Sequence, residues 1–254
     1  MLEVFKARWR QGHRTSSYPQ IKPTLPDRFR GLPILDQSKC LQGCQACADA
    51  CPTDAITVDE PGLKLDLGRC LFCTDCIEAC PEGAVAYKQE YRMAVRRRAD
   101  LVLSRDDLKL AQALDAKARR LFGRSLKLRQ VSAGGCNACE AEVNVLNTVV
   151  FDLGRFGIQF VASPRHADGL LITGPVTQNM KQALLATYEG VPPPKIVIAV
   201  GACAIAGGPF INHPEVHNGA DGVVPVDLYV PGCPPHPWTI LDGLLRLLGK
   251  LESQ

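Results

Sequence analysis

Two cysteine-rich stretches, CLQGCQACADACP at residues 40–52 and CLFCTDCIEACP at residues 70–81, decide how the N-terminal third of this chain folds. Each stretch carries four cysteines, and in each the fourth cysteine is followed by proline. The second stretch has the spacing C-x2-C-x2-C-x3-C-P, a bacterial pattern in which the fourth cysteine ligates the other of two [4Fe–4S] clusters. The pattern therefore predicts a small domain that folds around two iron–sulfur clusters.

If the fourth cysteine of each stretch ligates the cluster of the other stretch, the eight thiols form two candidate sites. Site 1 is Cys40, Cys44, Cys47 and Cys80, and site 2 is Cys70, Cys73, Cys76 and Cys51. Crossed ligands would hold two clusters at a short and fixed separation. C-x2-C pairs also occur in zinc sites, but tandem quartets that end in proline do not have zinc spacing. The first quartet departs from the pattern by one extra residue before Cys44, and Gly43 could let that residue loop out. A cluster with a different ligand set or potential is the alternative at this site.

Residues 36–88 contain an internal repeat, because CADACPTDAITVD and CIEACPEGAVAYK align cysteine for cysteine. Each half reads as a cysteine loop, a short helix that ends at Cys-Pro, and a small strand, at 55–58 and at 84–87. Residues 1–35 are expected to form an extended, proline-containing arm with a short helix at 1–10. Residues 89–128 are rich in Arg, Ala and Leu, and this composition predicts a basic helical linker.

Residues 129–254 have the pattern of an α/β domain. Apolar runs such as GLLITG, KIVIAV and VVPVDLYV alternate with helical stretches, the last of which begins at Pro237. This alternation predicts a doubly wound, flavodoxin-like parallel sheet, in which ligands bind beyond the carboxyl ends of the strands. Cys203 and Cys233 each follow one of the predicted strands, so both are expected at that edge.

The four remaining cysteines form a third candidate site. Site 3 is Cys136, Cys139, Cys203 and Cys233. The motifs GGCNACE, VGACAIAGG and PGCPPHP place each cysteine near glycine or proline, and small residues let backbone N–H groups approach cluster sulfurs. A buried structural cysteine is the alternative for any one of them. All twelve cysteines fall into three quartets, so three [4Fe–4S] clusters are predicted.

Composition and charge restrict the class of protein. The sequence has no run of about 18 apolar residues that would span a membrane, and its N-terminus lacks the apolar stretch of a signal peptide. We therefore expect a reducing compartment, where cysteines bind metal rather than form disulfides. The net charge is +3, with basic residues concentrated in 1–35 and 88–129. We interpret these segments as surfaces for acidic partners or anionic lipid and expect no nucleic acid partner.

Several stretches carry a resemblance to known families. Residues 131–250 resemble the small, cluster-bearing subunit of membrane-bound, energy-converting [NiFe] hydrogenases and the related 20-kDa subunit of respiratory complex I. The matching stretches are GGCNACEAE, SPRHADGLLITGPVT, VGACAIAGG and VPVDLYVPGCPPHP. Residues 1–100, with TSSYP, FRGLP and both cysteine runs, are similar to the separate ferredoxin-type subunit of formate hydrogenlyase. The chain thus resembles a fusion of two adjacent subunits of such a complex.

The resemblance implies an oxidoreductase subunit that passes electrons through three [4Fe–4S] clusters to a [NiFe] site, where protons are reduced to H2. That site would lie in a partner large subunit related to the complex I 49-kDa subunit, and no nickel is expected in this chain. Other implied partners are membrane-embedded antiporter-like subunits and an electron donor such as formate dehydrogenase or ferredoxin. The implied location is peripheral, on the cytoplasmic face of the cell membrane.

Two other functions stay open from the sequence. One is a cluster-bearing subunit of a complex I-like quinone oxidoreductase. Complex I-type subunits place two adjacent cysteines at the first position of site 3, whereas two residues separate Cys136 from Cys139 here, which favours the hydrogenase branch. The other is a non-catalytic iron–sulfur or zinc protein that binds nucleic acid through the basic segments. Tight, salt-sensitive binding to nucleic acid, with no redox partner, would favour it.

Glu140 is a further candidate site residue, because it directly follows Cys139. The family resemblance implies that acidic residues near this position pass protons at the subunit interface. Burial is expected to raise the pKa of the Glu140 carboxyl so that it acts as acid and base. The alternative is an acid placed at a helix start by the helix dipole. The histidines at 213, 217 and 236 are interpreted as loop residues rather than metal ligands.

Overall fold

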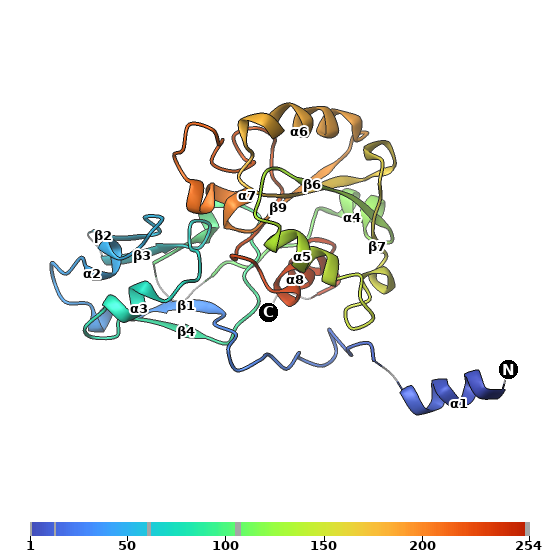
Figure 1. Cartoon of the computed structure of the whole chain (residues 1–254), viewed down its shortest axis with the longest axis horizontal. Coiled ribbons are helices and arrows are strands. Elements are labelled where there is room, and N and C mark those ends of the chain that lie inside the picture. Colours follow the sequence, from blue (N-terminus) through green and yellow to red (C-terminus); the bar gives the residue numbers. More distant parts are fainter. Residues whose placement is uncertain (1, 13, 60–61, 105–107, 252–254) are drawn as a thin grey trace.

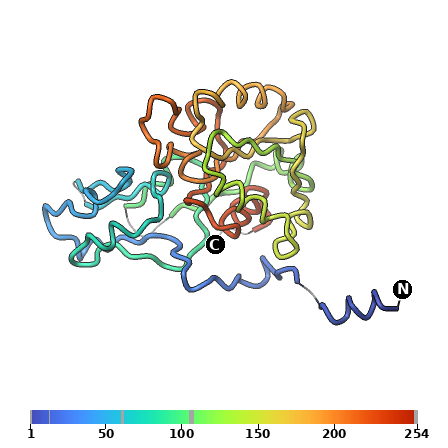
Figure 2. Tube along the Cα trace, viewed as in Figure 1, coloured from blue at the N-terminus to red at the C-terminus, as the bar shows by residue number. Residues whose placement is uncertain are grey.

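Two cysteine-carrying units lie side by side in the computed structural model, which describes residues 2–12, 14–59, 62–104 and 108–251 (Figure 1). The N-terminal unit is drawn in blue to cyan, and the C-terminal unit in green to red. The helix expected at the N-terminus is confirmed as α1 (Leu2–Gln11). It stands clear of both units at the end of the arm (Figure 2). Within the described ranges, no helix has both the length and the apolar composition needed to cross a bilayer.

The N-terminal unit repeats one short motif twice, as the aligned sequences predict. Its strands are β1 (Leu32–Leu35), β2 (Ile56–Asp59), β3 (Gly62–Asp66), β4 (Val85–Lys88) and β5 (Val102–Leu103). β1 pairs antiparallel with β4, and β3 pairs antiparallel with both β2 and β5. Short helices α2 (Ala46–Asp49) and α3 (Asp75–Ala79) occupy equivalent places in the two halves. The predicted ferredoxin-like fold is confirmed, with both repeat strands starting one residue later than expected.

The C-terminal unit is a five-stranded parallel sheet in the order β10-β9-β8-β6-β7. Its strands are β6 (Leu126–Ser132), β7 (Ile158–Phe160), β8 (Gly169–Thr173), β9 (Ile196–Val200) and β10 (Leu228–Val230). β8 and β9 are buried at every position, as expected of parallel strands covered on both faces. The strand order reverses between β6 and β8, which matches the flavodoxin-like order and confirms the predicted fold class.

Helices cover both faces of this sheet (Figure 1). They are α5 (Ala138–Val145), α6 (Gln178–Gly190), α7 (Ala202–Ala206) and α8 (Pro237–Leu247). One core joins α8 to the face that carries Leu128, and α6 covers the other face, where Leu184 packs near Val131. Alternate residues of β6 thus enter opposite cores, because successive side chains of a strand point to opposite faces.

The prediction of a helical linker over residues 89–128 is wrong for most of the residues described there. Among residues 89–104 and 108–128, which the structure describes, the α-helix is confined to α4 (Ala116–Phe122), and β6 already begins at Leu126. The reason is tertiary packing, which outweighs helix propensity. Met93 and Val95 enter the core of the N-terminal unit, and Ala94 between them enters the core of the C-terminal unit. Only an extended backbone divides successive side chains between two cores in this way.

This extended segment also fixes the two units to each other. Val95 forms an isolated antiparallel bridge with Tyr229 of β10, with N···O distances of 3.0 and 2.9 Å. The guanidinium of Arg98 donates two hydrogen bonds, of 2.7 and 2.5 Å, to the carboxylate of Asp66 in β3. Ile205 of α7 lies in the same apolar core as the leucines of β3. The two units therefore share one packed interface.

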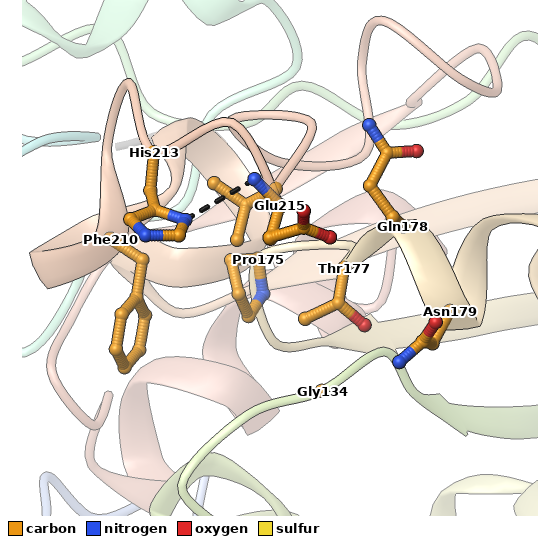
Figure 3. A pocket seen from close by; sticks show the side chains of 9 residues that line it. Gly134, Pro175, Thr177, Gln178, Asn179, Phe210, His213 and Glu215 are labelled. Atoms are coloured by element: carbon orange, nitrogen blue, oxygen red, sulfur yellow. Dashed lines mark hydrogen bonds between the residues drawn. The ribbon is translucent and has the colours of Figure 1, made fainter.

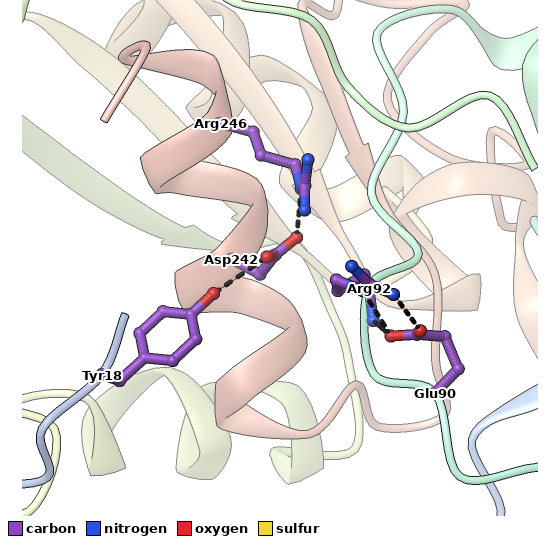
Figure 4. Close-up of polar contacts among 5 residues, drawn as sticks. All are labelled: Tyr18, Glu90, Arg92, Asp242 and Arg246. Carbon is purple, nitrogen blue, oxygen red and sulfur yellow. Dashed lines mark hydrogen bonds and ion pairs between the residues drawn. The ribbon is translucent and has the colours of Figure 1, made fainter. Parts of the chain in front are cut away.

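The arm crosses the C-terminal unit and is held there by a buried tyrosine (Figure 4). The Tyr18 hydroxyl donates a 2.9 Å hydrogen bond to Oδ1 of Asp242, and Nε of Arg246 donates a 2.7 Å hydrogen bond to Oδ2 of the same carboxylate. Arg155 donates hydrogen bonds to the backbone carbonyls of Ser16, at 2.6 Å, and Tyr18, at 3.1 Å. The arm ends as β1 and so becomes part of the N-terminal unit.

Three candidate iron–sulfur sites

The four thiols of site 1 line one small cavity between the two halves of the N-terminal unit. Cys40, Cys44, Cys47 and Cys80 all line it, together with Lys39 and Pro81. Cys47 is buried on α2, and Cys80 arrives from the second cysteine run, as the crossed assignment predicts. Burial is the main cause that raises the pKa of the Cys47 thiol, and the neighbouring Cys80 and Cys40 add to it. The structure thus brings the predicted quartet together, and its role as a ligand set stays a prediction.

Site 2 is built in the same way from the other half of the repeat. Cys70 and Cys76 are buried, whereas Cys73 and Cys51 are half-buried. Burial raises the pKa of Cys70 to about 12 and that of Cys76 to about 11, and the charge of Cys51 acts on both. Metal ligation requires the thiolate form, so a bound metal must supply the positive charge that ionises these thiols. Among the described residues, no cationic side chain acts on the pKa of Cys70 or Cys76. The two buried sulfurs are therefore suited to a metal cluster, whose own positive charge would stabilise the thiolates.

Backbone N–H groups point at the cysteine sulfurs in a pattern that repeats across the two halves. The N–H of Ala55 donates to Sγ of Cys51 at 3.2 Å, and the N–H of Ala84 donates to Sγ of Cys80, also at 3.2 Å. These residues are equivalent in the aligned sequences. Although burial opposes it, the backbone N–H groups of Ala84 and of its neighbours lower the pKa of Cys80. Such hydrogen bonds favour the charged sulfur and are one means by which a protein sets a cluster potential.

Site 3 lies at the carboxyl edge of the parallel sheet, beside the point where the strand order reverses. Cys136 and Cys139 follow β6, Cys203 lies on α7 directly after β9, and Cys233 follows β10. The thiols of Cys139, Cys203 and Cys233 each feel the charge of other cysteines in the quartet. Burial, together with these neighbours, raises the pKa of Cys139 and raises that of Cys203 to about 12. The sheet therefore brings together residues that are far apart in the sequence.

Two glycines allow the backbone to approach these sulfurs. Gly201 has φ of +91°, and a Cβ atom there would collide with Sγ of Cys139. Gly208 has φ of +56°, and its Cβ atom would lie 2.6 Å from Sγ of Cys203. Residues with a side chain rarely adopt these angles. The glycines that flank the cysteine motifs are thus needed for close packing around site 3, as the sequence indicated.

Glu140 lies at the start of α5 and is buried, with 6% of its surface exposed. Its Oε1 accepts hydrogen bonds from the hydroxyls of Ser132, at 2.6 Å, and Thr173, at 2.7 Å. Burial favours the neutral acid, but these donors outweigh it and lower the pKa of Glu140. The expected upward shift is therefore wrong, because the sequence did not reveal the two hydroxyls on β6 and β8. A role in proton transfer stays a prediction.

The three sites follow one another in space as they do in the sequence. The charge of Cys47 in site 1 acts on Cys76 in site 2. The charge of Cys73 in site 2 acts on Cys233 in site 3. Site 2 therefore lies between the other two. Cys136 and Cys233 are the exposed cysteines among the twelve, so site 3 opens to the outside of the chain.

A pocket of about 330 Å³ lies near site 3 (Figure 3). It is lined by Gly134, two residues before Cys136, and by residues that include Gln178 and His213. Nδ1 of His213 accepts a 3.2 Å hydrogen bond from the backbone N–H of Glu215, so this ring stabilises its own loop. Within the part of the chain that the structure describes, no three His, Cys, Asp or Glu side chains are grouped to hold a single metal ion.

Two family models match the chain. Residues 136–247 match the 20-kDa subunit of NADH:ubiquinone oxidoreductase, and residues 39–84 match a 4Fe-4S dicluster domain. The chain is 45% identical over 138 residues to the probable membrane-bound hydrogenase subunit mbhJ of Pyrococcus furiosus, covering 54% of this chain and 83% of that protein. It is 44% identical over 142 residues to formate hydrogenlyase subunit 7 of Escherichia coli, covering 56% of each.

A subunit of a quinone oxidoreductase matches at a similar identity over a shorter stretch. The chain is 44% identical over 122 residues to a subunit of the NADH-quinone oxidoreductase of Heliobacterium modesticaldum, covering 48% of this chain and 70% of that protein. Identity alone therefore does not separate a hydrogenase from a quinone oxidoreductase.

Proposed function

Because the chain belongs to the family of the 20-kDa subunit of NADH:ubiquinone oxidoreductase and also carries a 4Fe-4S dicluster domain, we propose that it conducts electrons through three [4Fe–4S] clusters. It is an iron–sulfur electron-transfer subunit of a membrane-bound hydrogenase or complex I-like assembly. We propose the hydrogenase, of formate hydrogenlyase type, with proton reduction at a [NiFe] site in a partner large subunit. The separated Cys136 and Cys139 favour this choice.

The observation that carries the proposal is the row of three four-thiol sites. Bound clusters would supply reversible electron storage, at potentials between about −700 and +450 mV, and proton reduction needs the low end of that range. Electrons from a donor such as formate dehydrogenase or ferredoxin would reach site 1 first and leave from site 3. The exposed edge at Cys136 and Cys233 is where a large subunit would cover site 3 and bring its metal centre near.

Each part of the chain has a distinct task in this proposal. Residues 36–88 hold sites 1 and 2, and residues 129–254 hold site 3. Residues 89–128 join the two units, and the bridge between Val95 and Tyr229 keeps sites 2 and 3 at a fixed separation. Residues 1–35 form the arm, which ties the N-terminal unit to α8 through Tyr18. The protein supplies position and electrostatic environment, and the cofactors supply the redox chemistry.

Metal analysis of the anaerobically purified complex tests the function. We expect about twelve iron atoms per copy of this chain, as four per cluster require, and nickel only in the fraction that holds the large subunit. Far fewer iron atoms would refute the three-cluster proposal. A full iron content in a complex that lacks nickel and reduces quinone would identify the complex I-like alternative.

We propose that α1 holds the complex at the cytoplasmic face of the membrane, next to membrane-embedded antiporter-like subunits. The large side chains Leu2, Phe5 and Trp9 form one stripe at helical spacing, and between 71% and 90% of their surface is exposed. Lys6 and Arg10 lie beside this stripe. An apolar stripe with flanking cations is typical of helices that lie in the headgroup region of anionic membranes.

Substitution of the two flanking cations tests this placement. Lys6→Gln combined with Arg10→Gln should weaken binding to anionic vesicles, because each cation near the surface contributes about 1 kcal/mol. Co-sedimentation of the purified protein with vesicles, at low and high salt, measures the effect. Lys39→Gln, an exposed cation on the N-terminal unit, serves as the matched control. Equal binding of all variants to anionic and neutral vesicles would contradict the proposal.

A further inference from the structure

Sites 2 and 3 are neighbours that share no cysteine run. In the crossed assignment, sites 1 and 2 exchange their fourth cysteines, so the chain itself ties one site to the other. Site 3 belongs to the other unit, and its exposed Cys233 lies near Cys73 of site 2. The bridge between Val95 and Tyr229 joins the units, but it lies outside the two cysteine loops. The separation of sites 2 and 3 therefore depends on further contacts between these loops.

Two adjacent residues of the arm reach both loops. The guanidinium of Arg30 donates hydrogen bonds to the backbone carbonyls of Phe72 and Cys73, the second at 3.4 Å. The ring of Phe29 meets the ring of His236 edge to face, with centroids 5.2 Å apart. His236 belongs to the PGCPPHP motif of site 3. Arg30 thus contacts the site 2 loop, while the residue before it contacts the site 3 loop.

The groups that these two residues contact are themselves held in place. Nδ1 of His236 accepts a 3.2 Å hydrogen bond from the backbone N–H of Trp238, which orients the ring at the start of α8. On the other side, the backbone N–H of Phe72 donates to Sγ of Cys70 at 3.3 Å. Through its backbone, Phe72 therefore connects Arg30 to a candidate ligand of site 2.

The arm cannot easily shift at this point, because it touches both units. A Cβ atom at Gly31 would collide with the backbone carbonyl of Lys88, so the arm runs in direct contact with the end of β4. The next residue, Leu32, opposes Lys88 in the pairing of β1 with β4. Phe29 packs against the core of the C-terminal unit. Residues 29–31 are thus held between the two units.

We propose that Phe29 and Arg30 hold the Cys73 loop beside the Cys233 loop and so set the distance that electrons cross between sites 2 and 3. In this step, one electron leaves the reduced cluster of site 2 and enters the oxidised cluster of site 3. Its rate falls steeply with distance, because the electronic overlap of two clusters decays exponentially. Both residues act through the cysteine loops, so they are positioning residues. The inference rests on the proposed function, since both sites must hold clusters.

Electron paramagnetic resonance of the fully reduced, purified complex tests the proposal. Two reduced clusters that lie close together split each other's signals, and the splitting weakens as their separation grows. Cys203→Ser removes site 3 and so identifies the splitting between sites 2 and 3. In Phe29→Ala combined with Arg30→Gln, we expect this splitting to shrink and the donor-driven turnover of the complex to fall severalfold. The iron content should stay at its wild-type value.

Arg28→Gln is the matched control, because Arg28 is an exposed arginine of the same arm. It should leave the splitting and the turnover unchanged. An unchanged splitting in the double variant, with full iron content, would overturn the proposal. A splitting that is already absent from the fully loaded wild type would do the same, because sites 2 and 3 would then be too far apart.

Two further outcomes would assign the residues another role and so overturn the proposal. One is a shifted midpoint potential of site 2 without any change in splitting, because Arg30 would then act by its charge. The other is loss of iron from site 2 in the double variant, because the arm would then hold the cluster itself. Low iron in the wild type would instead refute the proposed function.

Discussion

Cys203→Ser is expected to lower the iron content from about twelve to about eight atoms per chain, because a hydroxyl cannot replace the thiolate in a four-cysteine site. Cys203 is buried on α7, directly after β9, so no other residue can take its place without moving the sheet edge. Site 3 is the last of the three sites and the one that opens to the outside. Its loss should therefore abolish electron delivery to the partner while sites 1 and 2 stay reducible.

Iron analysis, electron paramagnetic resonance and donor-driven H2 evolution by the purified complex measure these effects. Ala206→Ser, on the same helix, adds the same hydroxyl without removing a sulfur and is the matched control. It should keep both iron and activity close to wild type. Wild-type H2 evolution by Cys203→Ser would show that electrons do not need site 3, and the proposed route would then be wrong.

Arg246→Leu is expected to give the largest loss of stability among single substitutions outside the cysteines. The Asp242 and Arg246 side chains are 1% and 6% exposed and form a 2.7 Å ion pair on α8. Removal of one partner of a buried pair costs about 3–5 kcal/mol, because the remaining charge is left uncompensated. Tyr18 shares the Asp242 carboxylate, so the arm should also detach more readily. Denaturant unfolding of the cluster-loaded chain measures the change.

The loss of stability in Arg246→Leu should become smaller as the pH falls. Burial raises the pKa of Asp242 in the folded state, and Arg246 opposes that shift. Without Arg246 the pKa rises further above its unfolded value of about 3.9. A group whose pKa is higher in the folded than in the unfolded state stabilises the folded state at low pH, and this contribution is lost as the pH rises. The difference between Arg246→Leu and wild type should therefore shrink towards pH 4.

A second variant separates the buried charge from the lost packing. Asp242→Leu combined with Arg246→Leu removes both charges and should recover much of the lost stability. Tyr18→Phe, which removes a single hydrogen bond to Asp242, should cost only about 1 kcal/mol. If the double variant is as unstable as Arg246→Leu alone, the stabilising effect lies in the shape of the arginine side chain and not in the ion pair.

Local pattern predicted the fold class well, because the signals are short-range. The cysteine-proline runs and the repeat predict the ferredoxin-like unit, and continuous apolar runs predict the buried strands β8 and β9. Pro237 marks the first residue of α8, as expected of a residue that fits the first helical turn. These features depend on neighbours within a few residues, so the sequence contains them directly.

The extended segment around Val95 and the environment of Glu140 could not be predicted in this way. Helical composition over 89–128 gave the wrong structure for most of the residues described there, since the partner of Val95 is Tyr229, far along the chain. The pKa of Glu140 is decided by hydroxyls on two different strands. Long-range pairing of this kind leaves no periodic signal in a single sequence.

The amino-acid sequence by itself determined which thiols are available as candidate cluster ligands, namely twelve in three groups. Cysteine spacing and small flanking residues are local properties. Only the tertiary structure decided that the groups stand in a row, with Cys47 near Cys76 and Cys73 near Cys233. That order depends on a core shared by both units, whose buried contacts join segments separated by more than a hundred residues. Packing across such separations is a property of the folded chain, since each contact exists only when all the others have formed.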